Sequence, residues 1–387
     1  MSDFKNKISK IKNSPYYRDR LIIKSAQDTN LSIDNKELIN FSSNNYLNLA
    51  NSNILKKEFS LAIKKYGIGS GSSPLISGYN IEAENLENNI SKKLALEATV
   101  VVNSGYMANV GIINAIAERN VAVFQDKLNH NSIIESSRLS TVELIRYKHN
   151  DYSDLVEKLK NSKVKTKIIF TDSVFSMTGQ KANLELLSEI ALANNAMLFI
   201  DDAHGFGAID GCGNKFPCSI NTQGLKNLKI DAYIGTFGKA VGTFGAFISG
   251  SKSLISLLIQ KSKPYIYSTA LPPALIRTTL KSINIISKGK YLEKLYSNIN
   301  YFKVLAAKND IKINKSETAI QSITIGDPKR VMQVHKSAIK NKILLQAIRY
   351  PTVPMHQDLL RINLTSGHTK KQIQSLIDFL KTIDKIK

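Results

Sequence analysis

Short runs of β-branched and aromatic residues alternate with helical segments between residues 46 and 280, and this alternation limits the folds open to the chain. Helical patterns cover 106–119, 152–160 and 183–194. The strand-like runs are ATVVVN (98–103), VAVFQD (121–126), KIIFT (167–171), AMLFIDD (196–202), DAYIGTF (231–237) and FGAFISG (244–250). Strands that alternate with helices form a mostly parallel sheet wrapped by helices. The sequence therefore predicts a large α/β domain over residues 46–280.

The two ends of the chain have different patterns. Helical segments near 275–308, 328–340 and 369–385 flank the strand-like runs TAIQSITIG, ILLQAIRY and LLRINLT, so we expect a small C-terminal α/β domain over 281–387. The first 24 residues hold seven basic side chains and few apolar ones. Residues 1–45 are therefore expected to form an N-terminal arm, exposed at its start, rather than an amphipathic surface helix.

The net charge of +22 raises the question of a nucleic acid or an anionic membrane as partner. Only nine basic residues are arginines, the residue type that base edges and bidentate phosphate contacts favour. The lysines are spread along the chain, and there is no tryptophan. We interpret the surplus as compositional bias and expect no nucleic acid partner. A lysine-rich nucleic-acid-binding protein is the alternative from another functional class.

The cysteines and the apolar runs set further limits. Cys212 and Cys218 are too few for a disulfide framework or a four-ligand zinc site, so we expect no metal and a reducing, cytoplasmic location. The N-terminus lacks the apolar core of a signal peptide, and no apolar run approaches the ~18 residues of a membrane span. We therefore expect no membrane partner.

Polar residues stand where several predicted strands end, which is where open α/β sheets bind ligands. Pyridoxal phosphate needs a lysine amine for an imine, a carboxylate at its ring nitrogen, and a helix N-terminus with hydroxyls for its phosphate. Lys239, Asp201 and the turn at 104–106 with Thr236 supply these three parts. The alternative is that the lysine is a solvated cap and that Asp201 and Asp202 only form a turn.

A series of motifs through nearly the whole chain resembles the α-oxoamine synthase family. They occur in the family's order: FSSNNYLNLA (41–50), YGIGSGSSPLISGYN (66–80), SGYMANVG (104–111), DKLNHNSII (126–134), VFSMTG (174–179), IDDAHGFGAIDGCG (200–213), TFGKAVGTFGAF (236–247), IYSTALPPA (266–274) and LRINLTSGHT (360–369). The resemblance implies a fold-type I pyridoxal-phosphate-dependent transferase of the aminotransferase class I/II fold.

Two segments narrow the resemblance within the family. IYSTALPPA and AIRYPTVP (347–354) are most similar to members that join L-alanine to a pimeloyl thioester in biotin biosynthesis. The thiol carrier is then coenzyme A or acyl carrier protein. The alternatives within the family use glycine with acetyl-CoA, glycine with succinyl-CoA, or a long-chain acyl thioester.

The resemblance implies roles for the residues that match the family's cofactor site. Lys239 is the imine lysine and, once displaced, the general base. Asp201 pairs with the ring nitrogen, and Asp202 is expected to be structural. His204 contacts the ring hydroxyl, and His130 stacks on the ring and contacts the substrate. His130 could instead be only an N-terminal helix contact.

Other matches concern the phosphate and the quaternary structure. Gly105 and Tyr106 open a helix whose N–H groups and dipole favour an anion. Ser176 and Thr236 are implied as hydroxyl ligands of the cofactor. Ser268 and Thr269 resemble the segment that reaches the phosphate from a second subunit, which implies a homodimer with its active site at the interface.

The substrate residues follow from the same resemblance. Arg361 and Asn44 match the pair that holds the amino-acid carboxylate, for which arginine is suited. Arg18 and Thr352 match positions that contact the acyl substrate, and the registration of Arg18 competes with that of Arg20.

The sequence departs from the family at two places. Asp172-Ser173 replaces a common Glu-Gly. This change puts in question whether the shorter carboxylate contacts the oxygen side of the cofactor ring. Residues 72–75 lack the usual Gly-Gly-Ser and basic residue, which affects the expected acyl or carboxylate recognition.

Overall fold

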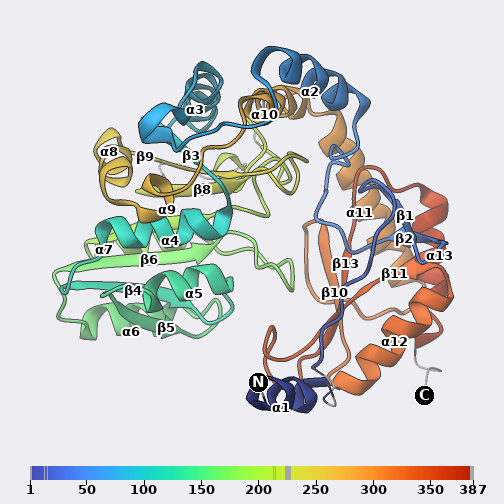
Figure 1. Cartoon of the computed structure of the whole chain (residues 1–387). Coiled ribbons are helices and arrows are strands. Elements are labelled where there is room, and N and C mark those ends of the chain that lie inside the picture. The colour runs from blue at the N-terminus through green and yellow to red at the C-terminus, as the bar shows by residue number, and fades with distance from the viewer. Residues whose placement is uncertain are drawn as a thin grey trace. The chain divides into compact units, whose positions relative to one another are not determined.

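The computed structural model describes residues 2–12, 14, 16–211, 213, 215–222 and 228–383, so Cys212 lies outside the described residues. The chain forms two compact units (Figure 1). The large unit comprises Leu49–Ser176 and Lys181–Leu292. The small unit comprises Met1–Asn48, Met177–Gln180 and Glu293–Lys387.

The large unit contains a seven-stranded sheet and the helices around it. Its strands are β3 (Ala98–Val102), β4 (Val121–Asp126), β5 (Glu143–Tyr147), β6 (Thr166–Asp172), β7 (Ala196–Asp201), β8 (Ala232–Thr236) and β9 (Ala246–Gly250). Its α-helices are α2 (Asn53–Tyr66), α3 (Ile81–Leu94), α4 (Gly105–Ile116), α5 (Asn131–Arg138), α6 (Tyr152–Asn161), α7 (Leu184–Ala193), α8 (Lys252–Lys261), α9 (Lys263–Ile266) and α10 (Pro273–Ile286). Two shorter helices are the π-helix η1 (Pro74–Gly78) and the 3-10 helix η2 (Ser219–Asn221).

The strand order of this sheet is β3-β9-β8-β7-β6-β4-β5. Strand β9 runs antiparallel to both of its neighbours, β3 and β8. All other neighbouring strands are parallel. Every strand except β9 therefore points the same way, and the carboxyl ends of these strands share one edge of the sheet. The predicted large, mostly parallel sheet is confirmed.

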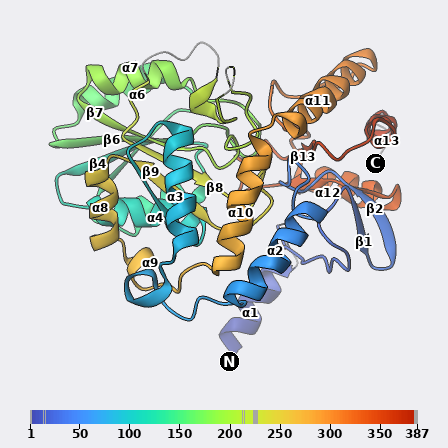
Figure 2. The same cartoon turned by 90° about the horizontal axis from the view of Figure 1, so that it is seen from above.

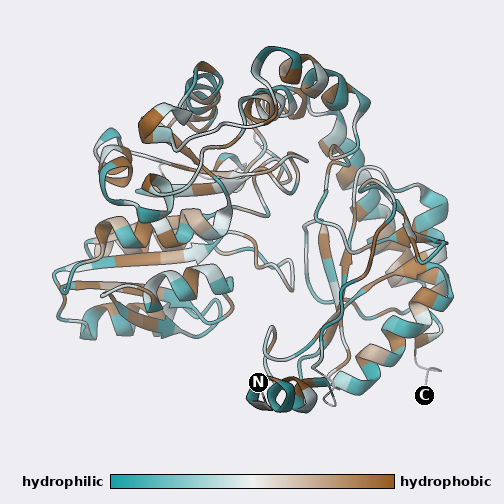
Figure 3. Cartoon of the chain, in the orientation of Figure 1, coloured by the Kyte–Doolittle hydropathy of each residue, from teal (hydrophilic) through white to brown (hydrophobic). Residues whose placement is uncertain are grey.

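Both faces of the sheet are buried, because alternate residues of each strand point to opposite faces. In β6, Ile168 and Phe170 pack in one core with residues of α4 and α8, whereas Ile169 packs in the other with residues of α6 and α7. Figure 2 shows these helix pairs on opposite sides of the strands. In Figure 3 the hydrophobic colour runs along the central strands, while the helices carry both colours.

The small unit contains two three-stranded sheets and several helices. Its strands are β1 (Asn30–Ile33), β2 (Lys36–Asn40), β10 (Ile320–Thr324), β11 (Ile343–Leu344), β12 (Gln346–Ile348) and β13 (Leu359–Asn363). Its helices are α1 (Ser2–Lys12), most of α11 (Lys290–Lys308), α12 (Pro328–Lys340) and α13 (Lys370–Leu380). The sheet orders are β1-β2-β11 and β10-β13-β12.

The N-terminal segment differs from the expected arm in its local structure. Residues 3–12 are exposed, as expected, but they belong to the helix α1, whereas an arm without a surface helix is predicted. Strands β1 and β2 form a hairpin, and β2 pairs in parallel with β11. Their short runs, NLSI and KELIN, are too polar to stand out in a periodicity search. Because of this pairing, residues before 49 cluster with the C-terminal region. The predicted domain boundaries after residues 45 and 280 stay predictions.

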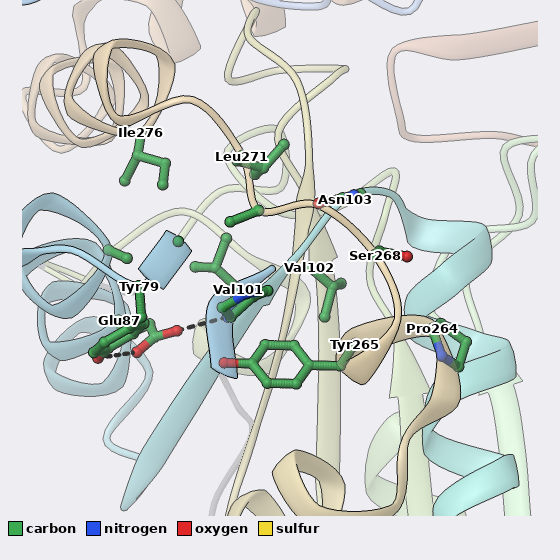
Figure 4. A pocket seen from close by; sticks show the side chains of 14 residues that line it. Tyr79, Glu87, Val101, Val102, Asn103, Pro264, Tyr265, Ser268, Leu271 and Ile276 are labelled. Atoms are coloured by element: carbon green, nitrogen blue, oxygen red, sulfur yellow. Dashed lines mark hydrogen bonds between the residues drawn. The ribbon is translucent and has the colours of Figure 1, made fainter. Parts of the chain in front are cut away.

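A side chain completes the hydrogen bonding of the edge strand β3. The backbone N–H of Val101 donates to Oε1 of Glu87 in α3 at 2.9 Å, and the Tyr79 hydroxyl donates to Oε2 at 2.8 Å (Figure 4). An edge strand leaves such N–H groups without a strand partner. Burial, the largest influence, raises the pKa of Glu87 from 4.5 to about 7.

The raised pKa of Glu87 predicts a pH-dependent stability. A folded-state pKa above the unfolded value means that proton binding favours the folded state. This contribution is fully present below about pH 4.5 and is lost as pH rises through about 7. Glu87→Gln keeps an acceptor for Val101 but cannot ionise. In urea unfolding, the free energy of unfolding of the variant should rise relative to that of the wild type by roughly 3 kcal/mol between pH 4.5 and pH 7. A pH-independent difference would contradict the assignment.

Candidate active site

Two carboxylates lie side by side at the edge of the large unit's sheet where the strands end. Asp172 closes β6 and Asp201 closes β7, and the strand register pairs these two residues. They are 2% and 4% exposed, respectively. The neighbouring strand β8 ends at Thr236, which is also buried. The sheet thus gathers two carboxylates and a hydroxyl at one place.

The carboxylate of Asp201 is fixed through both of its oxygens. The backbone N–H of Ala203 donates to Oδ1 at 2.9 Å, and Nδ2 of Asn109 in α4 donates to Oδ2 at 2.7 Å. Donors to both oxygens set the plane of a carboxylate.

Asp202 has a different environment, as expected for a structural residue. It is fully buried and accepts hydrogen bonds from the hydroxyls of Ser173, Ser219 and Tyr233. Burial raises the pKa of this carboxyl, and the three hydroxyl donors oppose the shift. These hydrogen bonds join β6, β7, β8 and η2 within the large unit.

His130 lies at the start of α5, beside both carboxylates. Its backbone N–H donates to Oδ2 of Asp172 at 2.6 Å. Its ring atom Nδ1 accepts from the backbone N–H of Ser132 at 3.3 Å and lies 2.7 Å from the Ser132 hydroxyl. Burial lowers the pKa of His130, Asp201 opposes this shift, and Lys239 adds to it. The helix contact that was the alternative interpretation is thus present, and it occurs within the polar cluster.

Asp172 takes the place of the family's common glutamate. Its side chain accepts from the His130 N–H, and its own backbone N–H donates to Oδ1 of Asn129 at 3.1 Å. Burial and the adjacent Asp201 raise the pKa of Asp172 well above its usual value, while Lys239 opposes the shift. The shorter side chain is therefore anchored to the loop that carries His130.

Lys239 follows β8 and is half-buried. The electrostatic effects on His130 and Asp172 place its ammonium in the same cluster as these two side chains. His204 and Ser176, at 8% and 7% exposure, are buried in the segments after β7 and β6. The large unit thus contains every residue predicted to contact the cofactor ring.

The N-terminus of α4 approaches Thr236 closely. A Cβ atom at Gly105 would lie 2.8 Å from Cγ2 of Thr236, so only glycine fits without a shift. Ser104 caps the helix by accepting from the Met107 N–H at 3.2 Å. The N–H groups of Gly105 and Tyr106, the first two residues of α4, have no acceptor within the helix. Glycine, open N–H groups and the Thr236 hydroxyl together suit a phosphate.

Ser268 and Thr269 lie in the segment after α9. The side chain of Asn103, two residues before Gly105, donates to the backbone oxygen of Thr269 at 2.9 Å. Ser268 and Asn103 both line the pocket that contains Tyr265 and Glu87 (Figure 4). The structure thus ties this segment to the residues that precede α4.

Arg361 and Asn44 come together in the small unit. A guanidinium nitrogen of Arg361 donates to Oδ1 of Asn44 at 3.1 Å, and the Tyr46 hydroxyl lies 3.2 Å from the same oxygen. Arg361 is 6% exposed, and burial lowers its pKa. Burial raises the pKa of Tyr46 to about 12, which keeps that partner neutral. A buried cation with neutral partners favours an anionic ligand.

Arg18 and Thr352 are both exposed and both lie near Arg349 in the small unit. Arg18 lowers the pKa of Arg349 by charge repulsion, after burial as the larger cause. Arg349 donates to the backbone oxygen of Tyr17 at 3.2 Å, and its own oxygen accepts from the Thr352 N–H at 2.9 Å. The two residues predicted to contact the acyl substrate therefore share Arg349 as a neighbour.

Sequence reasoning missed Asn109, Ser132 and Arg349 as candidates. Asn109 comes four residues after Gly105, so it lies on the same face of α4, a signal that could have identified it. Ser132 stands two residues after His130, in the loop-to-helix position typical of side-chain capping contacts. Arg349 lies inside AIRYPTVP, three residues before the predicted acyl contact Thr352.

Among the described residues, no group of three or more His, Cys, Asp or Glu side chains is arranged to hold a metal ion. No helix in the described part of the chain has the length and apolarity needed to cross a membrane.

The side chains at the sheet edge fit pyridoxal phosphate. A buried carboxylate with a fixed plane, at Asp201, suits a protonated ring nitrogen. The start of α4 with Thr236 suits the phosphate, and Lys239 supplies the amine.

Comparison with known proteins places the chain in a family. The family of aminotransferases of class I and II matches residues 36–380. The 8-amino-7-oxononanoate synthase of Thermoanaerobacter pseudethanolicus is 35% identical over 384 residues, which cover 98% of this chain and 96% of that protein.

Two solved structures share the fold. That of 8-amino-7-oxononanoate synthase from Francisella tularensis has a TM-score of 0.77 at 29% identity, with 90% of this chain and 98% of that chain covered. Serine palmitoyltransferase of Sphingomonas wittichii has a TM-score of 0.91 at 22% identity, with 99% and 98% covered, and this likeness shows the fold alone. The predicted fold class and the family resemblance are confirmed: the chain belongs to the 8-amino-7-oxononanoate synthases within the class I and II aminotransferase family.

Proposed function

We propose that this enzyme is a pyridoxal 5'-phosphate-dependent acyltransferase of biotin biosynthesis. It condenses L-alanine with pimeloyl-CoA or pimeloyl-acyl carrier protein and yields 8-amino-7-oxononanoate, carbon dioxide and the free thiol carrier. Membership in the 8-amino-7-oxononanoate synthases supports the reaction. The observation that carries the proposal is the cluster of Asp201, His130 and Lys239 beside the start of α4.

The large unit would hold the cofactor through four kinds of contact. The N–H groups of Gly105 and Tyr106 and the Thr236 hydroxyl bind the phosphate, and Asp201 binds the ring nitrogen. His204 and Ser176 would contact the cofactor from the same subunit, and Ser268 and Thr269 would reach the phosphate from the second subunit. When bound, pyridoxal phosphate supplies a protonated ring that stabilises negative charge developing at the amino-acid Cα.

Lys239 would move the proton. Its amine takes the Cα proton of alanine and returns a proton to the product carbon. Both Asp172 and His130 interact electrostatically with this amine. His130 would lie against the cofactor ring and so restrict its orientation.

Arg361 and Asn44 would bind the alanine carboxylate. The fork of the guanidinium matches a carboxylate, and the Asn44 contact orients that fork. Arg18 and Thr352 would contact the acyl substrate. Their shared neighbour Arg349 adds positive charge, which suits the acidic pimeloyl group and its acidic carrier.

A homodimer and a cytoplasmic location are part of the proposal. The large unit exposes several large apolar side chains, namely Ile68, Ile76, Phe244 and Tyr267. Two of their segments lie together, because Ala270 N–H donates to the Ser72 oxygen at 2.9 Å and Ser70 donates to the Ala270 oxygen at 2.6 Å. An exposed apolar surface of this kind supports an interface with a second copy.

The choice of amino acid can be read from the cofactor's absorbance. The purified enzyme should be yellow, and L-alanine should change its spectrum far more strongly than glycine at equal concentration. A colourless protein after incubation with pyridoxal phosphate, or a response to glycine alone, would contradict the proposed function. Glycine preference would instead favour a 2-amino-3-ketobutyrate ligase or a 5-aminolevulinate synthase.

Lys239→Ala should abolish turnover, by roughly 10²–10⁴-fold or more, because both the amine and the proton carrier are lost. Borohydride reduction followed by peptide mass spectrometry should label Lys239 in the wild type and leave the variant unlabelled. Lys57→Ala, an exposed lysine of α2, is the matched control and should retain activity. Turnover by the Lys239 variant at the control's rate would refute the role.

Arg361→Lys tests carboxylate binding, since lysine keeps the charge but loses the bidentate fork. The KM for alanine should rise about 10–100-fold, the effect of one charged hydrogen bond, while the KM for the acyl thioester changes little. Arg277→Lys, which alters an ion pair with Glu58 in the large unit, serves as control. An unchanged alanine KM would remove Arg361 from the site.

A further inference from the structure

A continuous chain of hydrogen bonds joins Asp201 to His130 in the large unit. Nδ2 of Asn109 donates to Oδ2 of Asp201 at 2.7 Å and to Oγ of Ser132 at 2.8 Å. The Ser132 hydroxyl lies 2.7 Å from Nδ1 of His130. Asn109 and Ser132 are 0% and 1% exposed. Two buried residues on different helices thus connect the expected ring-nitrogen partner to the expected ring-stacking histidine.

The orientation of the Asn109 amide follows from its partners. The amide NH₂ group faces Asp201, whose Oδ2 accepts from Nδ2. Both amide hydrogens are then used, one toward Asp201 and one toward Ser132. The amide oxygen Oδ1 is buried and has no hydrogen-bond partner among the described residues. An orphaned buried acceptor is unfavourable, which indicates that the position is retained for its two donors.

The direction of the remaining bonds fixes the tautomer of His130. A backbone N–H always donates, and the Ser132 N–H points at Nδ1, so Nδ1 is an acceptor. The Ser132 hydroxyl accepts from Asn109 and is then free to donate to the same ring nitrogen. A ring nitrogen that accepts a hydrogen bond carries no proton, so this contact corresponds to the neutral imidazole. In a neutral ring with an acceptor at Nδ1, the proton resides on Nε2.

We propose that Asn109 and Ser132 are positioning residues that orient the Asp201 carboxylate and hold His130 as its Nε2–H tautomer. The inference rests on the proposed function, in which the Nε2–H of His130 would donate a hydrogen bond to the substrate. One amide, that of Asn109, thus contacts Asp201 directly and His130 through Ser132.

The tautomer is measured directly on ¹⁵N-histidine-labelled wild-type enzyme, with and without pyridoxal phosphate. Two-bond ¹H–¹⁵N correlation spectra at pH 7.5 should show His130 with a protonated Nε2 and an unprotonated Nδ1. His130→Gln assigns the signal. A predominantly Nδ1–H ring would overturn the inference, and it would leave the proposed reaction untouched.

Ser132→Ala removes the link and keeps Asn109 bonded to Asp201. The difference between the two ¹⁵N shifts of His130 should shrink, because Nδ1 loses its 2.7 Å hydroxyl partner and keeps only the longer 3.3 Å contact with the Ser132 backbone N–H. The dissociation constant of pyridoxal phosphate should change less than about threefold, since Asp201 keeps its donor. Ser136→Ala is the matched control, because its equally buried hydroxyl bonds only to the Ile133 carbonyl in the same helix. Identical His130 spectra in the two variants would overturn the proposal.

Asn109→Asp keeps the shape of the side chain and replaces its donors by a second carboxylate beside Asp201. Binding of pyridoxal phosphate should weaken about tenfold or more, and more than in Asn109→Ala. A role in packing alone predicts the opposite order, which would refute the donor role. Loss of cofactor binding in the wild type would overturn the proposed function instead, while the tautomer result would stand.

Discussion

Two like charges buried on adjacent strands dominate the chemistry of the large unit. Asp172 and Asp201 are register partners in β6 and β7, and each is almost fully removed from solvent. Like charges this close cannot both ionise without compensation. At Asp201 the compensation comes from the Ala203 N–H and the Asn109 amide. At Asp172 it comes from the His130 N–H and from Lys239, and the pKa of this carboxyl is still raised by burial and by Asp201. The division of roles between the two carboxyls follows from this asymmetry.

The sequence indicated the residues at strand ends because β-branched runs identify buried strands without any knowledge of packing. Asp201, Thr236 and Lys239 could be found in this way, and so could the start of α4. Asn109 and Ser132 have only a weak local signal, their spacing from Gly105 and His130, because the value of both side chains depends on which helix faces which strand. The roles of His130 and Arg361 came from resemblance, and only the structure supplied their partners.

The small unit shows a different limit of sequence reasoning. The polar runs of β1 and β2 pair with each other and with β11, which lies some three hundred residues later, and this pairing has no local signal. Arg361 is held by Asn44 through an equally remote contact. Long-range pairing of this kind is decided by complementary edges and burial, not by periodicity.

One consequence concerns how the site can evolve. His130 is both a member of the polar cluster and the residue that caps α5, through the same ring nitrogen. Replacing it with another capping residue preserves the helix start but loses the flat ring, while other aromatic side chains keep a ring but lose the cap. Because one ring nitrogen serves both the helix cap and the contact with Ser132, a substitution at this position changes the start of α5 and the hydrogen-bond chain to Asp201 at the same time.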